Sequence, residues 1–400
     1  MLAAELVLET AAEETMARAE QWRRQLQPQQ DEEQQSALSA GVDAARAVVA
    51  LVALVYGTNY ATVKLLDEQI GTTSLGALLR FSICACAITP ALLMVGSRQP
   101  KVLQRSMVAS GLEIGVWMGL GYIVQAMALE TSAAATQAFL LSLTVIVCPF
   151  LETALDGVRQ PARVWFAAGL SVVGVALLEA SNLLTSGGCA PGDVLGLLQP
   201  VFFGVGFYRL ESAMGAHVRE GSCAPEPPLS SGDVALALTT YQTWTVLVMA
   251  FGWAMLDSGS IGALMSNVVE ASALAAASPA MIGALLWCGI VTTAGCSFAE
   301  AQALSRLSAS DAMVIFATEP LWAAAFAWCT LGETMGPAAI GGGGLIVLSC
   351  VLSSGAGLPP DDQPSHPDHG AGRRSDARDY TSDTVPALLA VSDDGVDGRC

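Results

Sequence analysis

Long apolar stretches recur along the middle of the chain, separated by short polar gaps. Ten of them lie between two polar ends, at residues 46–66, 74–96, 107–128, 132–153, 162–180, 192–211, 234–256, 279–300, 311–331 and 337–354. Each is about as long as the roughly 20 residues that an α-helix needs to cross a bilayer. The pattern predicts an all-α membrane protein with ten transmembrane helices.

The basic residues support this count of spans. Of the 18 Lys and Arg residues, 8 lie in the tails or at the start of the first span, and 8 more lie in loops, or at the span ends next to them, on the same side as the tails. The other two, Lys64 and Arg80, lie within predicted spans, and the opposite loops contain none. Loops rich in Lys and Arg stay in the cytosol, so both termini are expected there.

The two halves of the sequence resemble each other at a constant offset of 175 residues. The matching pairs include Ala126/Ala301, Leu129/Leu304, Ala134/Ala309, Gly157/Gly332 and Gly169/Gly344. The offset maps the third, fourth and fifth spans onto the eighth, ninth and tenth. Because each copy would have five spans, an odd number, the two copies would lie in opposite orientations in the membrane. Such inverted repeats are typical of transporters. We therefore expect repeats at residues 46–180 and 181–355, flanked by tails at 1–45 and 356–400.

Composition agrees with a membrane body and assigns the net charge to the tails. Hydrophobic residues make up 53% and charged residues 14% of the chain, against about 25% charged residues in soluble domains. The net charge is −18, and residues 1–45 and 361–397 hold nine acids each. We expect the first tail to be partly disordered and the second, rich in Gly, Pro, Asp and Ser, to be disordered. The acidic balance argues against nucleic-acid binding.

Several chemistries lack the residues that they need. The three histidines, His217, His366 and His369, all lie outside the apolar stretches, and no GxxxxGK[ST] phosphate loop occurs. An embedded zinc site or Ser–His pair cannot be built without a histidine in a span. The sequence therefore predicts a protein that is not an enzyme, with no cofactor and no metal.

The second half carries the most specific motif. Residues 303–349 read ALSRLSASDAMVIFATEPLWAAAFAWCTLGETMGPAAIGGGGLIVLS, with Glu-Pro in one helix, a Gly-Glu turn and a glycine-rich last helix. This segment resembles EamA-type members of the drug/metabolite transporter superfamily. In the first half, Val145 and Val158 stand where the repeat would have the equivalents of Pro320 and Glu333.

Four further segments extend this resemblance to about residues 46–355. GTNY (57–60) and LLRF (78–81) are similar to signatures of the first and second helices, and residues 111–150 and 192–214 are similar to the plant and algal branch. The resemblance implies a transporter of small organic molecules, often an exporter, and specifies no substrate.

Polar residues inside spans are costly and mark candidate sites. Glu319 lies near the middle of the ninth span, directly before Pro320, which should kink the helix because it lacks an N–H donor. A carboxyl group at such a kink could bind a substrate amine or a proton. The structural alternative is a Glu that is hydrogen-bonded to a neighbouring helix.

Other embedded polar residues complete the candidate site. Gln125 and Glu300 occupy matching positions at the 175 offset, Gln199 precedes Pro200, and Arg80 lies deep enough to need a partner, for which Glu130 is the expected acid. Helix packing and an interfacial Glu300–Arg306 ion pair are the structural alternatives. The predicted substrate-binding set is Asn59, Arg80, Gln125, Gln137, Gln199, Glu300 and Glu319, with Glu319 also the predicted coupling residue.

These residues favour secondary transport of a small metabolite by alternating access, with proton coupling through Glu319 as a hypothesis. Cationic Lys64 and Arg80 opposite two acids suit a neutral or zwitterionic solute, amino-acid-like or aromatic, better than a phosphate ester. The alternative is a non-transporting receptor or scaffold of the same fold. The expected partners are this solute and the lipid bilayer. The sequence leaves open a homodimer and the choice between plasma and organelle membranes, plastids included.

The distribution of basic residues predicts that both termini face the cytosol. Reporter fusions at each end, or labelling of introduced cysteines in intact cells, should give the same side for both. Termini on opposite sides would contradict an even number of spans and, with it, the inverted repeat.

Overall fold

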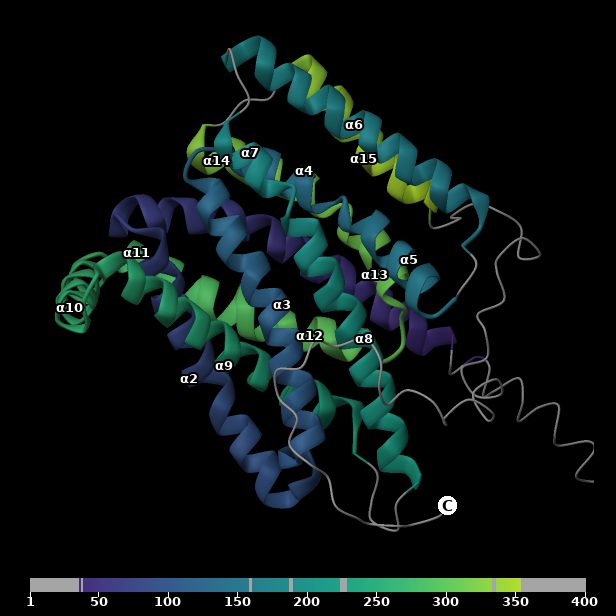
Figure 1. Ribbon diagram of the computed structural model, residues 1–400, viewed down its shortest axis with the longest axis vertical. Helices are drawn as coiled ribbons and strands as arrows, with labels where there is room; N and C mark the ends of the chain where they lie inside the picture. Colours follow the sequence, from purple (N-terminus) through teal and green to yellow (C-terminus); the bar gives the residue numbers. More distant parts are fainter. Residues whose placement is uncertain are drawn as a thin grey trace, which may run out of the picture. The chain divides into compact units, whose positions relative to one another are not determined.

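The computed structural model describes residues 36, 39–157, 160–186, 190–223, 229–332 and 336–353. The chain divides into two units, Met1–Ala356 and Gly357–Cys400, and all described residues belong to the first. The second tail and nearly all of the first therefore lie outside the described residues. Every regular element within them is a helix (Figure 1), which confirms the all-α prediction.

Within the described residues, seven helices are long and apolar enough to cross a membrane. They are Ser39–Ile70, Thr73–Arg98, Arg105–Leu129, Ala134–Leu155, Ser231–Ser258, Pro279–Ala303 and Ala309–Leu331. They coincide with seven of the ten predicted spans and establish a multi-pass membrane protein. The other three predicted spans are also helical, in α6 (Ala162–Ser186), in α7 (Pro191–Gly196) with α8 (Gln199–Cys223), and in α15 (Pro337–Ser353).

One helix was not expected. Residues 257–278 were expected to be a connection between two spans, whereas the structure has α10 at Ile261–Ala277. The Ser260 side chain caps this helix by accepting a hydrogen bond from the backbone N–H of Ala263 at 3.2 Å. Leu264 is buried in a cluster with Leu75 of α2 (Thr73–Arg98), so α10 packs back onto the body.

Two of the long spans are interrupted in the middle. The fourth consists of α4 (Ala134–Leu141) and α5 (Thr144–Leu155), and the ninth of α13 (Ala309–Phe316) and α14 (Glu319–Leu331). The break before Pro320 agrees with the kink that the proline predicts. The span at α7 and α8 is interrupted in the same way, just before Pro200.

The interruptions of the fourth and ninth spans fall at equivalent positions. α4 begins and ends 175 residues before α13, and α5 begins 175 residues before α14. Val145 stands at the counterpart of Pro320, so this break forms without a proline. Nearby hydroxyl groups bond to carbonyls there instead: Ser142 donates to Phe139 O and Thr144 to Leu141 O, both at 2.5 Å.

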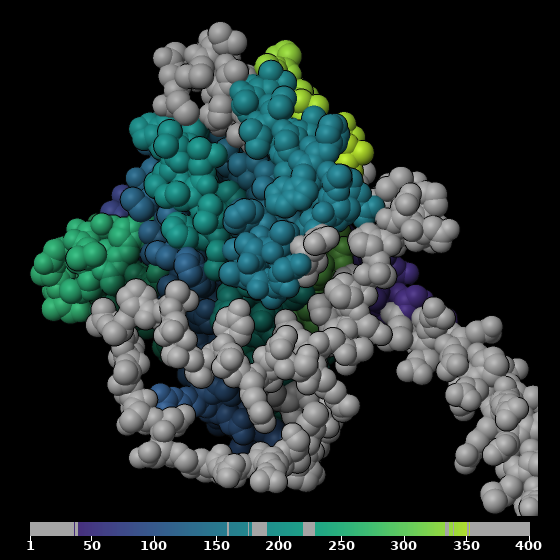
Figure 2. Space-filling model, turned by 45° about the vertical axis from the view of Figure 1, so that its right-hand side comes forward, coloured from purple at the N-terminus to yellow at the C-terminus, as the bar shows by residue number. Residues whose placement is uncertain are grey.

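The broken helices pack on each other reciprocally. α4 contacts α14, and α5 contacts α13, so the interrupted spans run side by side in opposite order. α2 packs along α9 (Ser231–Ser258), and α3 (Arg105–Leu129) lies between α8 and α9. α6 and α15 form a long pair at the side of α5 and α13 (Figure 1), and Figure 2 shows α15 in yellow-green at the upper right.

Close approach of α6 and α15 depends on small residues. The Ser171 and Ser349 hydroxyl groups bond to each other across the pair. Gly174 lies against the backbone of Gly342 and the side chain of Ile346, with no room for a Cβ atom. Small residues at helix interfaces allow close backbone contact in membrane proteins.

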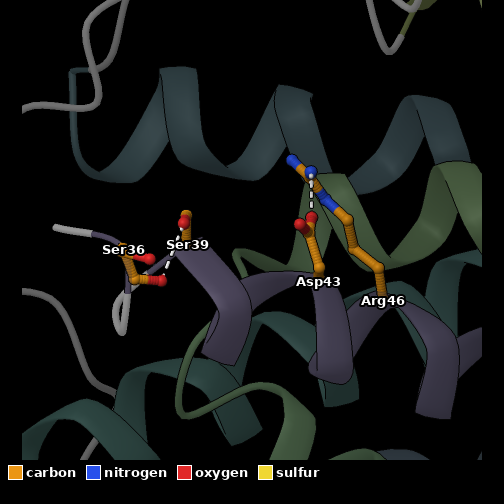
Figure 3. Close-up of polar contacts among 4 residues, drawn as sticks. All are labelled: Ser36, Ser39, Asp43 and Arg46. Carbon is orange, nitrogen blue, oxygen red and sulfur yellow. Dashed lines mark hydrogen bonds and ion pairs between the residues drawn. The ribbon is translucent and has the colours of Figure 1, made fainter. Parts of the chain in front are cut away.

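The first helix, Ser39–Ile70, is continuous through the polar run at Gly57–Asn59. Near its start, the Ser39 hydroxyl donates to Ser36 O at 2.9 Å, and Arg46 pairs with Asp43 at 3.2 Å on an exposed face (Figure 3). The eighth predicted span consists of α11 (Pro279–Leu286), the π-helix η2 (Trp287–Gly295) and α12 (Cys296–Ala303).

Gly174→Ala should lower the thermal stability of the purified protein, since its Cβ would meet Gly342 O and Ile346. Overpacking of this kind costs about 1–3 kcal/mol. Gly169→Ala on the same helix is the matched control, because its Cβ would meet no atom within 4 Å. Unfolding midpoints in detergent test the difference; equal midpoints would contradict a tight α6–α15 contact.

Candidate functional site

A cavity lies where the broken helices meet the first helix, α3, α8, α9 and the η2–α12 segment. About 60 Å³ of it is open to the centres of water molecules, room for roughly four to six waters at about 10–15 Å³ each. Its lining includes two carboxyl groups, six aromatic rings, and the amide and hydroxyl groups of eight further residues. Among the described residues, no group of three or more His, Cys, Asp or Glu residues could hold a metal ion.

Four of the predicted site residues line this cavity: Asn59, Gln125, Glu300 and Glu319. Glu300 and Glu319 are 3% and 6% exposed, so both acids are embedded. The other three predicted residues, Arg80, Gln137 and Gln199, are buried but lie outside the lining.

The lining itself repeats at the 175-residue offset. Seven pairs of lining residues are separated by 175 positions: Met118/Thr293, Tyr122/Ser297, Gln125/Glu300, Ala138/Met313, Leu141/Phe316, Ser142/Ala317 and Thr144/Glu319. They come from α3 with η2 and α12, and from the two broken spans. Equivalent positions of the two halves therefore face one common space.

The two acids differ in their hydrogen bonds. The Tyr56 hydroxyl donates to Glu300 Oε2 at 2.9 Å. Asn59, one turn further along the first helix, accepts from the Thr292 hydroxyl at 2.9 Å. These contacts tie the first helix to η2 and α12, and they give Glu300 a hydrogen-bond donor from the protein.

Glu319 lies in a corner of the cavity with unused hydrogen-bonding groups. Tyr60 is 1% exposed, and its hydroxyl makes no hydrogen bond of ordinary geometry with any described residue. Glu319 and Gln125 are the polar side chains beside it. A buried hydroxyl group without a partner is costly, so this corner is suited to a ligand or water.

Another part of the lining is aromatic. Phe207 lies between Phe203 and Phe316, with ring centroids 6.5 Å and 6.0 Å away. Tyr122 meets the Phe203 ring edge-on at 5.1 Å. The cavity therefore has a polar, acidic part and an aromatic part.

The structure corrects the expected partner of Arg80. No ion pair joins Arg80 to Glu130 within the described residues; Glu130 accepts from the Thr73 hydroxyl at 2.5 Å instead. The guanidinium carbon of Arg80 lies 4.7 Å from the ring centroid of Phe81 and 5.6 Å from that of Tyr122. Its Nε and Nη2 atoms are buried without a hydrogen-bond partner among these residues. Cation–π contacts thus surround the charge, which lies behind the Tyr122 ring.

Gln137 and Gln199 bind each other. Gln199 Nε2 donates to Gln137 Oε1, and Gln137 Nε2 donates to Gly192 O at 3.1 Å. Both side chains are 0% exposed. They connect α4 to α7 and α8, so their hydrogen bonds stabilise helix packing around the break between α7 and α8.

Two polar clusters join loops at opposite ends of the helices. The first polar cluster has three contacts: Lys64 Nζ to Ser132 O at 3.2 Å, Thr73 to Glu130, and Ser132 to Asp193. These residues lie at the first–second, third–fourth and fifth–sixth connections, which the sequence places outside.

The second polar cluster joins α5 and α8 to each other and to the start of α13. Ser310 donates to Glu152 at 2.5 Å, the Ala309 N–H to Glu211 at 2.9 Å, and Tyr208 to Asp156 at 3.0 Å. The sequence places this end inside.

Several lining residues were not predicted, although two lie at helical spacing from predicted ones. Tyr56 lies three residues before Asn59, and Ser297 three residues before Glu300. Tyr60 directly follows Asn59 and lies four residues after Tyr56, so it shares a helix face with Tyr56 and not with Asn59. Thr293 lies in the π-helix, where α-helical spacing does not apply. The sequence did not single out the aromatic lining residues of α8, because aromatic residues are common in membrane-spanning helices.

Residues 234–355 match the model of the EamA-like transporter family. This range, less than half of the chain, runs from α9 through α15 and contains Glu300 and Glu319. The second half of the chain is therefore similar to a family of transporters.

No curated protein matches the chain. Among solved structures, 19 chains match. One, described as "Crystal structure of protein", is 16% identical over 76% of this chain and 96% of that chain, with a TM-score of 0.46. A likeness of this size carries no argument about function.

Tyr56→Phe should destabilise the folded protein by about 1–3 kcal/mol, because it leaves the buried Glu300 carboxyl group without its hydrogen-bond donor. Tyr60→Phe removes a hydroxyl group that has no partner among the described residues, so it should leave stability unchanged or slightly higher. Unfolding midpoints of the two variants in the same detergent test this. Equal destabilisation would mean that the Tyr60 hydroxyl also has a protein partner.

Proposed function

We propose that this chain is a secondary transporter that moves a small organic solute across a membrane by alternating access. The observation that carries the proposal is the cavity at the two interrupted spans, with two embedded carboxyl groups in its lining. Interrupted helices line substrate and ion sites in secondary transporters. The EamA match of residues 234–355 adds independent support.

The proposed architecture is ten spans in two inverted five-helix repeats, 46–180 and 181–355. The equivalent interruptions support it, as do the reciprocal contacts of α4 with α14 and α5 with α13. The seven lining pairs at the 175-residue offset add a third, separate reason. Inverted repeats can exchange conformations, so such a molecule can open to either side in turn.

In this mechanism the two polar clusters act as gates at opposite ends of the cavity. Opening to the outside breaks the first cluster, at Ser132–Asp193 and Thr73–Glu130, while the second stays bonded. Opening to the inside separates the start of α13 from Glu152 and Glu211. The α4–α14 and α5–α13 contacts let each half of a broken span move with its partner.

Proton coupling follows from charge balance in the cavity. Glu300 and Glu319 share an enclosed space whose described lining contains no Lys, Arg or His. Unbalanced charge inside a membrane is costly, so a proton or a cationic solute must accompany these carboxylates. Glu319 lies beside Tyr60 without a hydrogen bond of ordinary geometry like the one from Tyr56 to Glu300, and it lies at the interruption of the ninth span. We assign proton binding during transport to Glu319.

Glu319→Gln should abolish solute accumulation driven by a pH gradient in proteoliposomes, because the amide cannot exchange a proton. The variant should still allow the solute to move down its own concentration gradient. A panel of amino acids and aromatic amines serves to find the solute, and Glu270→Gln, an exposed acid of α10 outside the lining, is the control.

Unchanged pH-driven uptake in the folded Glu319→Gln variant would assign Glu319 a structural role. Absence of flux for every solute with the unaltered protein would instead favour the receptor or scaffold.

A further inference from the structure

We infer that the solute is an organic cation with a protonated amine and an aromatic or apolar body, and with no carboxylate group. The amine binds at the corner formed by Tyr60, Gln125 and Glu319. This inference rests on the proposed transport function and names the substrate class of that site.

The charges around the cavity select for a cation. The described lining contains the carboxyl groups of Glu300 and Glu319 and no basic side chain. A zwitterion would need a cationic group for its carboxylate. Arg80 lies outside the lining, with the Tyr122 ring against it, and Lys64 donates to a backbone carbonyl in the first polar cluster. A solute carboxylate would therefore face two acids without a counter-charge.

Unused hydrogen-bonding groups define where the amine binds. Glu300 accepts a hydrogen bond from Tyr56, and Asn59 accepts one from Thr292. These polar groups of the lining are therefore already paired within the protein. The Tyr60 hydroxyl is buried next to Glu319 and Gln125 and makes no hydrogen bond of ordinary geometry with any described residue.

An ammonium group offers donors that each of these three side chains can accept. A carboxylate, a hydroxyl and an amide oxygen together match the three N–H donors of a primary ammonium group.

The aromatic part of the lining defines the rest of the solute. Phe203, Phe207 and Phe316 form a row of rings, and Tyr122 closes one end of it. Aromatic side chains contribute large apolar contact areas, and their ring faces also attract cations. A short arylalkylamine places its ring against this row and its ammonium group at Glu319.

The test uses three small molecules of similar shape. Phenethylamine carries the ammonium group, 2-phenylethanol is its neutral analogue, and phenylalanine adds the carboxylate. Titration calorimetry with the purified full-length protein should show phenethylamine binding at least ~10-fold more tightly than the other two, as expected for a charge-assisted hydrogen bond in a buried site. Its affinity should also fall as the pH is lowered, since protons compete for the same carboxylate.

Variants separate the corner from the rest of the cavity. Tyr60→Phe should keep the stability of the unaltered protein but weaken phenethylamine binding by ~10-fold, while binding of 2-phenylethanol changes less. Glu319→Gln should remove the preference for the amine over the alcohol. Glu270→Gln, the control, should bind all three molecules as the unaltered protein does.

Three results would overturn the inference: phenylalanine binding as tightly as phenethylamine, no phenethylamine binding at millimolar concentration, or unchanged amine affinity in folded Tyr60→Phe. Flux measurements distinguish this failure from failure of the proposed function. Accumulation of phenylalanine without phenethylamine would keep transport and reject the organic cation. Tight phenethylamine binding without flux would keep the site and reject transport.

Discussion

Backbone polar groups inside a membrane must find partners within the protein, and the two interrupted spans show how this chain meets that demand. At the first break, the N–H groups of Ser142 and Val145 donate to carbonyls three residues earlier, at 3.2 Å and 3.1 Å. At the second, Thr318 and Leu321 do the same, both at 3.1 Å. These tight turns, with hydroxyl groups on nearby carbonyls, satisfy the backbone while the helix axis changes direction. The cavity exists because both spans can be interrupted without leaving backbone groups unpaired.

The electrostatics of the interior depend on the same arrangement. Each broken span places a polar residue at the start of its second half, Thr144 in one and Glu319 in the other, and both line the cavity. The first helix supplies the tyrosines beside the two acids. The nearby embedded cation, Arg80, lies against the rings of Phe81 and Tyr122, and Asp67 is an acid in electrostatic contact with it. Negative charge therefore faces the cavity, and positive charge lies behind an aromatic side chain.

Much of this organisation could be predicted from the sequence. The lengths of the apolar stretches and the 175-residue offset between the halves can both be read directly along the chain. The depth of Glu319 beside Pro320, and the Gln125–Glu300 match, led to residues that line the cavity. Gln137 and Gln199 are equally embedded, but depth does not say which way a side chain points around its helix, and these two bind each other.

The remaining features have weak local signals. The break between α4 and α5 contains no proline, and its hydroxyl–carbonyl bonds come from residues that also occur in straight helices. α10 follows α9 after a short turn at a left-handed Gly259, and its small residues resemble a connection. The π-helix has no sequence signature that separates it from the α-helices on either side.

The π-helix η2 has a consequence for how the chain tolerates changes in length. Its i→i+5 bonding puts one extra residue into the turn, and consecutive Thr292 and Thr293 both face the cavity. A π-turn winds by a smaller angle per residue than an α-turn, so it takes up its extra residue locally. Deleting one residue there, with a return to α-helical winding, would leave α12 close to its present direction and keep Glu300 on the cavity side. The same deletion in α11, which has ordinary winding, would rotate everything beyond it by about 100° and turn Glu300 away from Tyr56. Chain length in α11 therefore sets the direction of a carboxyl group, whereas η2 tolerates the loss of a residue.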